Sequence, residues 1–181
     1  MRVYILMQNS VIYIDASTGE VGKMKVEGDD ITLLENSAVV SLGNSTSDFL
    51  ITGGYAFVTD KGDEEGKDAG QVIETYPGTN TVIEARVMNE TWSLSHANHR
   101  MIQSRYLHKG ITYSKDGKDR VFMLGGKCYD YYLHSMEELV EGSWIYRSSM
   151  ATPRASFDAI VNDDKIFVVG GYSGPCTFAE P

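Results

Sequence analysis

The chain has 181 residues, enough for one sizeable core, and its 42% hydrophobic and 23% charged residues are ordinary for a globular protein. Its formal net charge of −9 argues against a nucleic-acid partner, because binding a phosphate backbone requires clustered Lys and Arg. No apolar run approaches the roughly 18 residues that a membrane helix needs. These properties predict a soluble, cytoplasmic protein that binds neither nucleic acid nor membrane.

The first 54 residues favour short apolar strands joined by tight turns. The N-terminal apolar run is too short for a signal peptide and lacks a small-residue cleavage pattern, so it is interpreted as a strand. A polar turn at residues 17–19 predicts a hairpin. The expected strands are residues 2–7, 11–15, 21–26, 38–42 and 49–52.

Residues 55–80 are interpreted as an insertion with a charged, glycine-rich and acidic centre. Such a run is usually solvated and mobile. Residues 71–76 form an apolar stretch before Pro77 that could add one short strand. Two interpretations stay open for the insertion: a solubilising loop, or a loop that contacts a partner.

A glycine pair recurs three times, each time directly after an apolar strand. The strands read FLIT, VFML and IFVV, and the pairs are Gly53-Gly54, Gly125-Gly126 and Gly170-Gly171. The second and third pairs are 45 residues apart, which is the usual period of a propeller blade. The first two are 72 apart, which equals one period plus an insertion.

Other features recur in the same order. Trp92 and Arg105 precede the second glycine pair, and Trp144 and Arg154 precede the third. A similar strand and turn comes before each Trp. The segment MEELVEG (136–142) favours a helix in isolation, but its place in the repeat predicts a strand.

The stretch from Trp144 to Gly171 resembles a kelch repeat, with a Trp, then Met and Pro-Arg, then two apolar strands, the second ending in Gly-Gly. The resemblance implies an all-β fold, namely a partial β-propeller of about three four-stranded antiparallel blades. The expected segments are a degenerate blade at 1–54, a blade with an insertion at 55–126, a clear blade at 127–171 and the start of another at 172–181. Further blades would come from a longer parent chain.

In such a blade, the glycine pairs and the Trp residues serve packing and turn geometry. The loop entering the first strand and the loop leaving the second lie on one face, where kelch propellers commonly hold partner peptides. The resemblance therefore suggests partner-binding residues on this rim: Arg105, Arg154, Tyr55, Lys127 and Tyr172. For the two arginines an alternative stays open, in which the guanidinium packs between blades and binds backbone carbonyls.

The sequence offers few signals of chemistry. His96 and His99 are interpreted as solvated loop residues, His134 as a loop residue and His108 as a packing residue, so no metal site, cofactor or catalytic residue is predicted. The only two cysteines, Cys128 and Cys176, are interpreted as reduced thiols. Some kelch-type propellers are copper oxidases with a cysteine-linked tyrosine, but no matching set of His ligands stands here.

The expected function is that of a kelch-type scaffold or adaptor that binds another protein through the loop-rich face and has no catalysis of its own. Two alternatives remain. One is an enzyme on a kelch propeller, of the oxidase or sugar isomerase type. The other is an incomplete fragment of a longer kelch protein.

Overall fold

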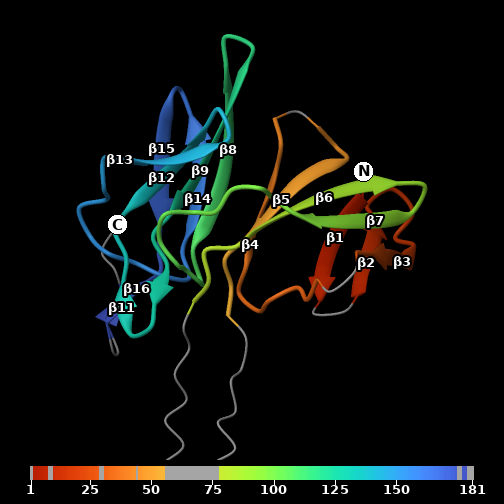
Figure 1. The fold of residues 1–181 in the computed structure, drawn as a ribbon, viewed down its shortest axis with the longest axis horizontal. Coiled ribbons are helices and arrows are strands. Elements are labelled where there is room, and N and C mark those ends of the chain that lie inside the picture. The colour runs from red at the N-terminus through yellow and green to blue at the C-terminus, as the bar shows by residue number, and fades with distance from the viewer. Residues whose placement is uncertain are drawn as a thin grey trace, which may run out of the picture.

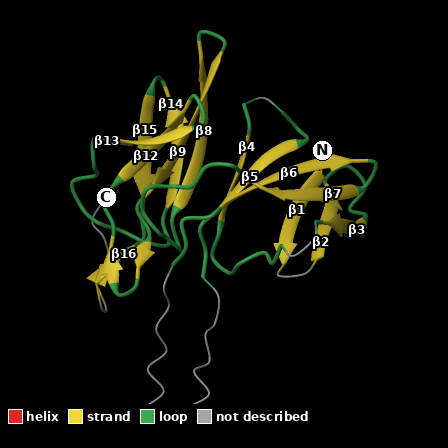
Figure 2. Cartoon of the chain, viewed as in Figure 1, coloured by secondary structure: helices red, strands yellow, loops and turns green. Residues whose placement is uncertain are grey.

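The computed structural model describes residues 2–7, 10–28, 31–43, 45–55, 78–174 and 177–178. Within these ranges the chain forms strands and turns without any helix, so no described helix could cross a membrane (Figures 1 and 2). The strands are β1 (Arg2–Met7), β2 (Ser10–Asp15), β3 (Val21–Glu27), β4 (Ala38–Ser41), β5 (Asp48–Thr52), β6 (Val82–Met88), β7 (Thr91–His96), β8 (Lys109–Lys115), β9 (Lys118–Leu124), β10 (Lys127–Cys128), β11 (Tyr131–Tyr132), β12 (Met136–Val140), β13 (Ser143–Arg147), β14 (Asp158–Asn162), β15 (Lys165–Val169), β16 (Tyr172–Gly174) and β17 (Thr177–Phe178). The all-β expectation is confirmed.

The largest sheet has seven strands in the order β1-β2-β3-β7-β6-β5-β4. Strands β4 to β7 form an antiparallel meander, and β1 to β3 form a second one. The two meanders join through a short parallel pairing of β3 with β7, in which Val26 lies opposite Trp92. The sheet curls, so that β1 to β3 lie at the right of Figure 1 and β4 lies near its centre.

A second sheet has four antiparallel strands in the order β13-β12-β9-β8, and β14 pairs with β15 in a separate hairpin. Strand β4 at the edge of the first sheet contacts β8 of the second sheet, and β8 contacts β14 of the hairpin. The first sheet, the second sheet and the hairpin are therefore neighbours in that order. Two small ribbons, β10-β11 and β16-β17, lie together below the larger sheets in Figure 1.

The hydrogen-bonded sheets do not coincide with the segments expected from the sequence. The first two glycine pairs lie within a sheet, between β5 and β6 and between β9 and β12, so these sheets continue across the expected boundaries at residues 54 and 126. The first sheet is also mixed, whereas four-stranded antiparallel sheets were expected. The reason is that strands on either side of a glycine pair belong to the same sheet. A segment that runs from one glycine pair to the next therefore contains strands of two different sheets.

Three hydrophobic cores hold these strands together: one lies between the two halves of the curled seven-stranded sheet, one between that sheet and the second sheet, and one between the second sheet and the β14-β15 hairpin. Strand β9 shows how the sequence builds two of them. Val121 and Met123 point into the core shared with β4 and β5, while Phe122 and Leu124 point into the core shared with β14 and β15. A strand covered on both faces needs apolar residues at every position, which explains the continuous run VFML.

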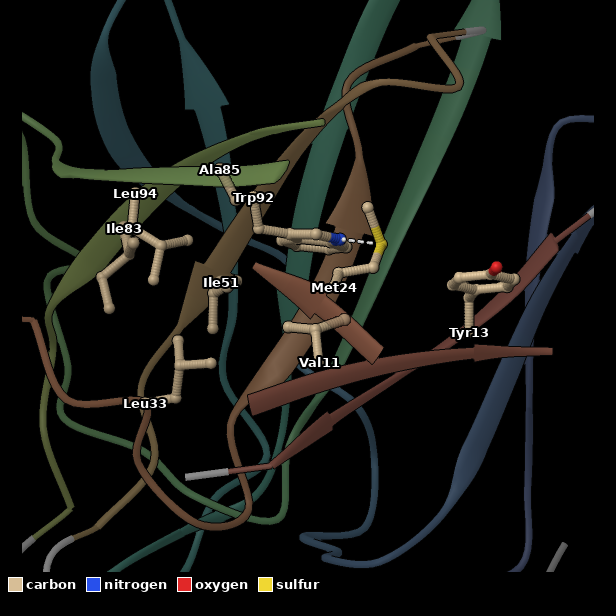
Figure 3. Close-up of a cluster of buried hydrophobic side chains, with 9 residues drawn as sticks. All are labelled: Val11, Tyr13, Met24, Leu33, Ile51, Ile83, Ala85, Trp92 and Leu94. Atoms are coloured by element: carbon tan, nitrogen blue, oxygen red, sulfur yellow. Dashed lines mark hydrogen bonds between the residues drawn. The ribbon is translucent and has the colours of Figure 1, made fainter. Parts of the chain in front are cut away.

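Trp92 lies in the core between β1 to β3 and the β4 to β7 meander, and only 1% of it is exposed (Figure 3). Its ring stacks on Phe49, with 5.2 Å between centroids, and its indole N–H points to the sulfur of Met24 at 3.2 Å. Trp144 occupies the next core and donates its indole N–H to Nδ1 of His99 at 3.1 Å. Each indole N–H therefore has one partner, as a buried Trp requires.

The glycine pairs allow neighbouring units to approach closely. Both glycines of the second pair have positive φ, 53° at Gly125 and 95° at Gly126. A Cβ on Gly126 would lie 2.6 Å from the carbonyl oxygen of Tyr106 and 2.7 Å from Cβ of His108. Only glycine fits this combination of conformation and contact.

Candidate functional site

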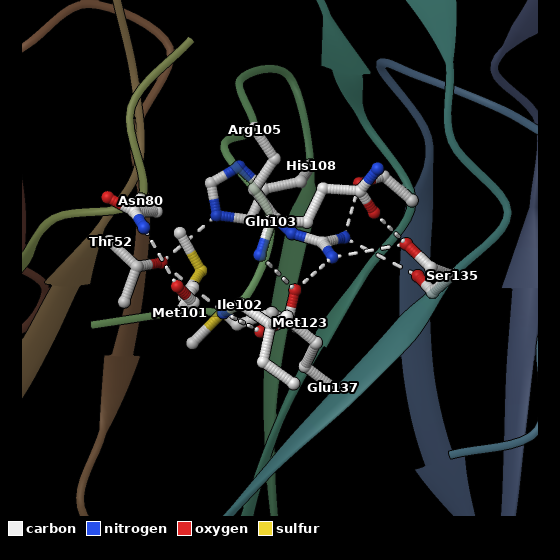
Figure 4. Close-up of polar contacts among 11 residues, drawn as sticks. Thr52, Asn80, Met101, Ile102, Gln103, Arg105, His108, Met123, Ser135 and Glu137 are labelled. Atoms are coloured by element: carbon white, nitrogen blue, oxygen red, sulfur yellow. Dashed lines mark hydrogen bonds and ion pairs between the residues drawn. The ribbon is translucent and has the colours of Figure 1, made fainter. Parts of the chain in front are cut away.

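Arg105 is completely buried and links two glycine pairs. Figure 4 shows its side chain among its polar neighbours. Its carbonyl oxygen accepts the N–H of Gly54 at 2.9 Å. Its guanidinium donates to the carbonyl oxygen of Gly125 at 2.7 Å and forms an ion pair with Glu137 at 2.6 Å. The side chain thus extends through the interior, from the loop of one sheet to the loop of the next.

Arg154 repeats this arrangement one unit later. Its carbonyl oxygen accepts the N–H of Gly126 at 2.9 Å, and its guanidinium donates to the carbonyl oxygen of Gly170 at 2.8 Å. Arg154 is 6% exposed. Both arginines are buried and bind backbone carbonyls, which is the alternative stated for them, and they do not present their guanidinium groups on the rim.

Glu137 completes the Arg105 cluster and was not singled out from the sequence. Both of its carboxylate oxygens accept backbone N–H groups, from Ile102 at 2.6 Å and from Gln103 at 3.0 Å (Figure 4). Ser135 also accepts from the Arg105 guanidinium, at 3.2 Å. Burial lowers the pKa of Arg105, and the Glu137 carboxylate opposes that shift. The Glu137 carboxylate thus neutralises the buried charge of Arg105, as a buried ion requires.

His108 lies beside this cluster, where burial and the charge of Arg105 hold the pKa of its imidazole well below the ordinary value. Its Nε2 and the hydroxyl of Thr52 share a hydrogen bond of 3.0 Å. Its Nδ1 has no hydrogen-bond partner among the residues that the structure describes. His108 is therefore a neutral residue of the interface between two units, and packs where the sequence suggested.

The same loops carry four tyrosines and one lysine, which we call the tyrosine row: Tyr55, Tyr106, Lys127, Tyr132 and Tyr172. Tyr106 is buried and the other four are half-buried. The rings of Tyr55 and Tyr106 meet edge to face at 5.2 Å, and those of Tyr132 and Tyr172 do so at 5.7 Å. The ammonium of Lys127 joins the two pairs, at 5.9 Å from the Tyr106 ring and 5.0 Å from the Tyr132 ring.

Backbone pairing holds the tyrosine row in place. Tyr106 bridges Lys127, and Lys127 in turn lies opposite Tyr132 in the β10-β11 ribbon. Tyr172 bridges Ala155, which follows the buried Arg154 directly. The residues after the second and third glycine pairs are therefore fixed next to the loops that contain Arg105 and Arg154, whereas Tyr55, after the first pair, bridges Glu35.

The tyrosine row combines four phenol side chains with one positively charged lysine. Burial, assisted by the charge of Asp130, raises the pKa of Tyr106 to about 12. Burial also raises the pKa values of Tyr55 and Tyr132. Tyr55, Tyr106 and Tyr132 therefore stay protonated at physiological pH, while Lys127 supplies a cation over the rings of Tyr106 and Tyr132.

Two exposed tyrosines extend the row toward solvent. Tyr131 is 76% exposed and Tyr129 is 52% exposed, and both belong to the ribbon loop that follows the second glycine pair. The carbonyl oxygen of Tyr129 accepts the hydroxyl hydrogen of Tyr106 at 2.9 Å, which anchors this loop. Cys128 lies opposite Tyr131 and is half-buried, and burial raises the pKa of its thiol.

The described ends of the insertion leave from the same face. Tyr55 donates a hydrogen bond to Glu35 at 3.2 Å, and Thr79 donates its N–H to the carbonyl oxygen of Gly54 at 2.9 Å. Residues 56–77, with the expected strand at 71–76, lie outside the described part of the chain. Beside Glu35 there is a hollow of about 510 Å³, lined by Leu6, Leu33, Leu34, Glu35, Asn36, Ser37, Val39 and Ile51.

The histidines lie apart from one another. His99 accepts the Trp144 indole N–H and is half-buried, so the interpretation of it as a solvated loop residue is corrected. His96 and His134 are exposed. Among the described residues, no three His, Cys, Asp or Glu side chains gather in a way that could hold a metal ion. Cys176 lies outside the described residues.

Tyr106, Tyr132 and Glu137 are the site residues that sequence reasoning missed. A signal for the tyrosines was present, because a tyrosine follows the first and the third glycine pair directly and another follows Arg105. No local signal marked Glu137, since its partner Arg105 is 32 residues away in the sequence. An acidic residue in a strand usually predicts a solvated position.

No protein-family model matches the sequence, and no curated protein matches it. Among solved structures, the chain is similar to a structure of YjhT, with a TM-score of 0.65 at 12% sequence identity. The match covers 94% of this chain and 47% of that chain, so the chain spans about half the length of the structure that it matches. At this identity the likeness concerns the fold alone.

Proposed function

We propose that the chain is a kelch-type propeller segment that acts as a cytoplasmic protein-binding scaffold, without catalysis of its own, and that the tyrosine row receives the partner. The observation that carries the proposal is the row itself, four tyrosines and one lysine that contact one another on loops joined by backbone bridges. Support for the kelch-type interpretation comes from the repeated Trp, Arg and glycine-pair positions in stacked β-units.

Tyrosine is well suited to such a surface. It offers a large contact area at a low cost in side-chain entropy, and its hydroxyl adds a directional hydrogen bond. The exposed rings of Tyr129 and Tyr131 provide the accessible area, and the inner rings hold their loop in position. Lys127 favours a partner segment that carries a carboxylate, because it is the one cation within the row.

The hollow beside Glu35 supports the same proposal. It lies next to the Tyr55 end of the row, and leucines and other apolar residues form part of its lining. An extended partner segment can place one apolar side chain there while its backbone follows the tyrosines. Anchoring of this kind concentrates binding energy in a few buried side chains.

Selection of random displayed peptides on the immobilised protein tests the proposal, followed by fluorescence anisotropy with the enriched peptides. We expect the double variant Lys127→Ala, Tyr131→Ser to weaken binding by about tenfold or more, because it removes the cation and an exposed ring. Tyr146→Ser is the matched control, since Tyr146 is 54% exposed but lies on β13 outside the row.

Two results would count against the proposed function. One is a selection that enriches no peptide above the background of the immobilisation surface. The other is an equal loss of affinity in the control and in the double variant, which would place the binding outside the row.

A further inference from the structure

Among the residues that the structure describes, the hairpin β14-β15 packs against the hydrophobic core through one face only. Its inward residues, among them Ala159, pack against Ile111 and Phe122 of the neighbouring sheet. Its outward face carries three exposed apolar side chains, with Ile160 at 60%, Phe167 at 45% and Val169 at 64% exposure. Ile160 and Phe167 lie directly opposite each other, so the three form one patch rather than scattered residues.

The opposite end of the stack shows the same property. The inward face of β1 to β3 holds Val11, Tyr13 and Met24 in the first core. Its outward face carries Ile5, which is 41% exposed, and Val21, which is 63% exposed. Ile5 lies opposite Ile12, and Ile14 lies opposite Val21, so this second patch runs across three strands.

We propose that these two end faces bind each other between two copies of this chain, so that the hairpin of each copy packs on the β1 to β3 face of the other. Inside one chain, the units already pack in this manner, with the apolar face of one β-unit against the next. The end faces repeat the chemistry of these internal interfaces, but within the described part of the chain their apolar side chains are exposed.

A second copy fits because such a stack closes on itself. In a dimer with a two-fold axis, the hairpin patch of each copy packs on the β1 to β3 patch of the other copy. Both patches of both copies are then covered, and the assembly is closed. The fold comparison agrees in size, because 94% of this chain matches 47% of the YjhT chain, so two copies supply about the length of that fold. Closure also removes uncovered sheet faces, which otherwise favour uncontrolled aggregation.

Sedimentation velocity over a concentration series tests the proposal with the 181-residue chain. We expect a species of twice the chain mass for the unaltered protein and for Tyr146→Asp, a control at an exposed position outside both patches. Phe167→Asp alone and Val21→Asp alone should each sediment as a monomer, because each places a charge in one of the two patches.

Sedimentation of a mixture of the two variants is the decisive experiment. Phe167→Asp retains an intact β1 to β3 face and Val21→Asp retains an intact hairpin face, so an equimolar mixture should recover a dimer through one remaining interface. Recovery would also show that neither variant is merely unfolded. A monomeric unaltered chain, open polymers, dissociation of the Tyr146→Asp control or a mixture that stays monomeric would each overturn the proposal.

Discussion

Arg105 and Arg154 each join two successive glycine pairs, using the backbone carbonyl on one side and the guanidinium on the other. A guanidinium suits this task because it has several donors in a fixed plane and can satisfy a carbonyl and a carboxylate together. At Arg105 the carboxylate is Glu137, and neither side chain is exposed. Of the residues that the sequence marked for recognition, these two arginines therefore hold neighbouring parts of the fold together.

Replacing Arg105 by Met should destabilise the protein by about 3–5 kcal/mol, because the Glu137 carboxylate would stay buried without its cation. Arg147→Met is the control. Arg147 pairs with Glu138, but its side chain is 40% exposed and Arg120 also binds Glu138, so a loss below about 1 kcal/mol is expected. Urea unfolding measures both values, and equal losses would refute the role of Arg105.

The stability of the fold should depend on pH through His108. Its lowered pKa means that, below the ordinary histidine pKa of about 6.5, the unfolded chain binds a proton that the folded chain does not. Above that pH, His108 is neutral in both states and stability does not depend on it through pH. Below that pH, the free energy of unfolding falls by up to about 1.4 kcal/mol per pH unit.

Urea unfolding between pH 8 and pH 5 should therefore show a steeper decline for the unaltered protein than for His108→Asn. His96→Asn, at an exposed histidine, should follow the unaltered protein. Parallel curves for the unaltered protein and His108→Asn would contradict the buried neutral state of His108.

At the scale of the elements, the first two glycine pairs follow β5 and β9, whose last residues are buried on both faces of the strand, and turn the chain against the next sheet. After β5 the chain turns at Gly53 beside Arg105 and His108, and after β9 it turns at Gly125 beside Arg154. At both turns the residue must adopt a positive φ, and its neighbours leave no space for a Cβ.

Two alanine substitutions separate these requirements. Gly142 has φ of 77° and open space around it, so Gly142→Ala should cost only the conformational strain of roughly 1–2 kcal/mol. Gly126→Ala adds a Cβ 2.6 Å from a backbone oxygen and should cost clearly more, or prevent folding. Thermal unfolding compares them, and an equal drop in melting temperature would argue against the close approach.

At the scale of the whole molecule, the stacking of β-units creates two kinds of surface. The loops after the glycine pairs meet on one face and carry the tyrosine row, while the two ends of the stack expose the apolar faces of β14-β15 and β1 to β3. No residue of the row belongs to either end patch, so partner binding and self-association use separate side chains. One scaffold can thus carry both proposed activities.

The sequence by itself determined the all-β class, the strands on either side of each glycine pair and the strand rather than helix at 136–140, because these depend on local alternation, turn residues and repeat order. Only the tertiary structure decided which strands share a sheet, that the arginines turn inward and that Tyr106 and Tyr132 join one row. The parallel contact of β3 with β7 joins residues more than 60 positions apart, and Arg105 meets Glu137 across 32. Burial of a charge and convergence of side chains depend on such long-range contacts, which local sequence patterns do not specify.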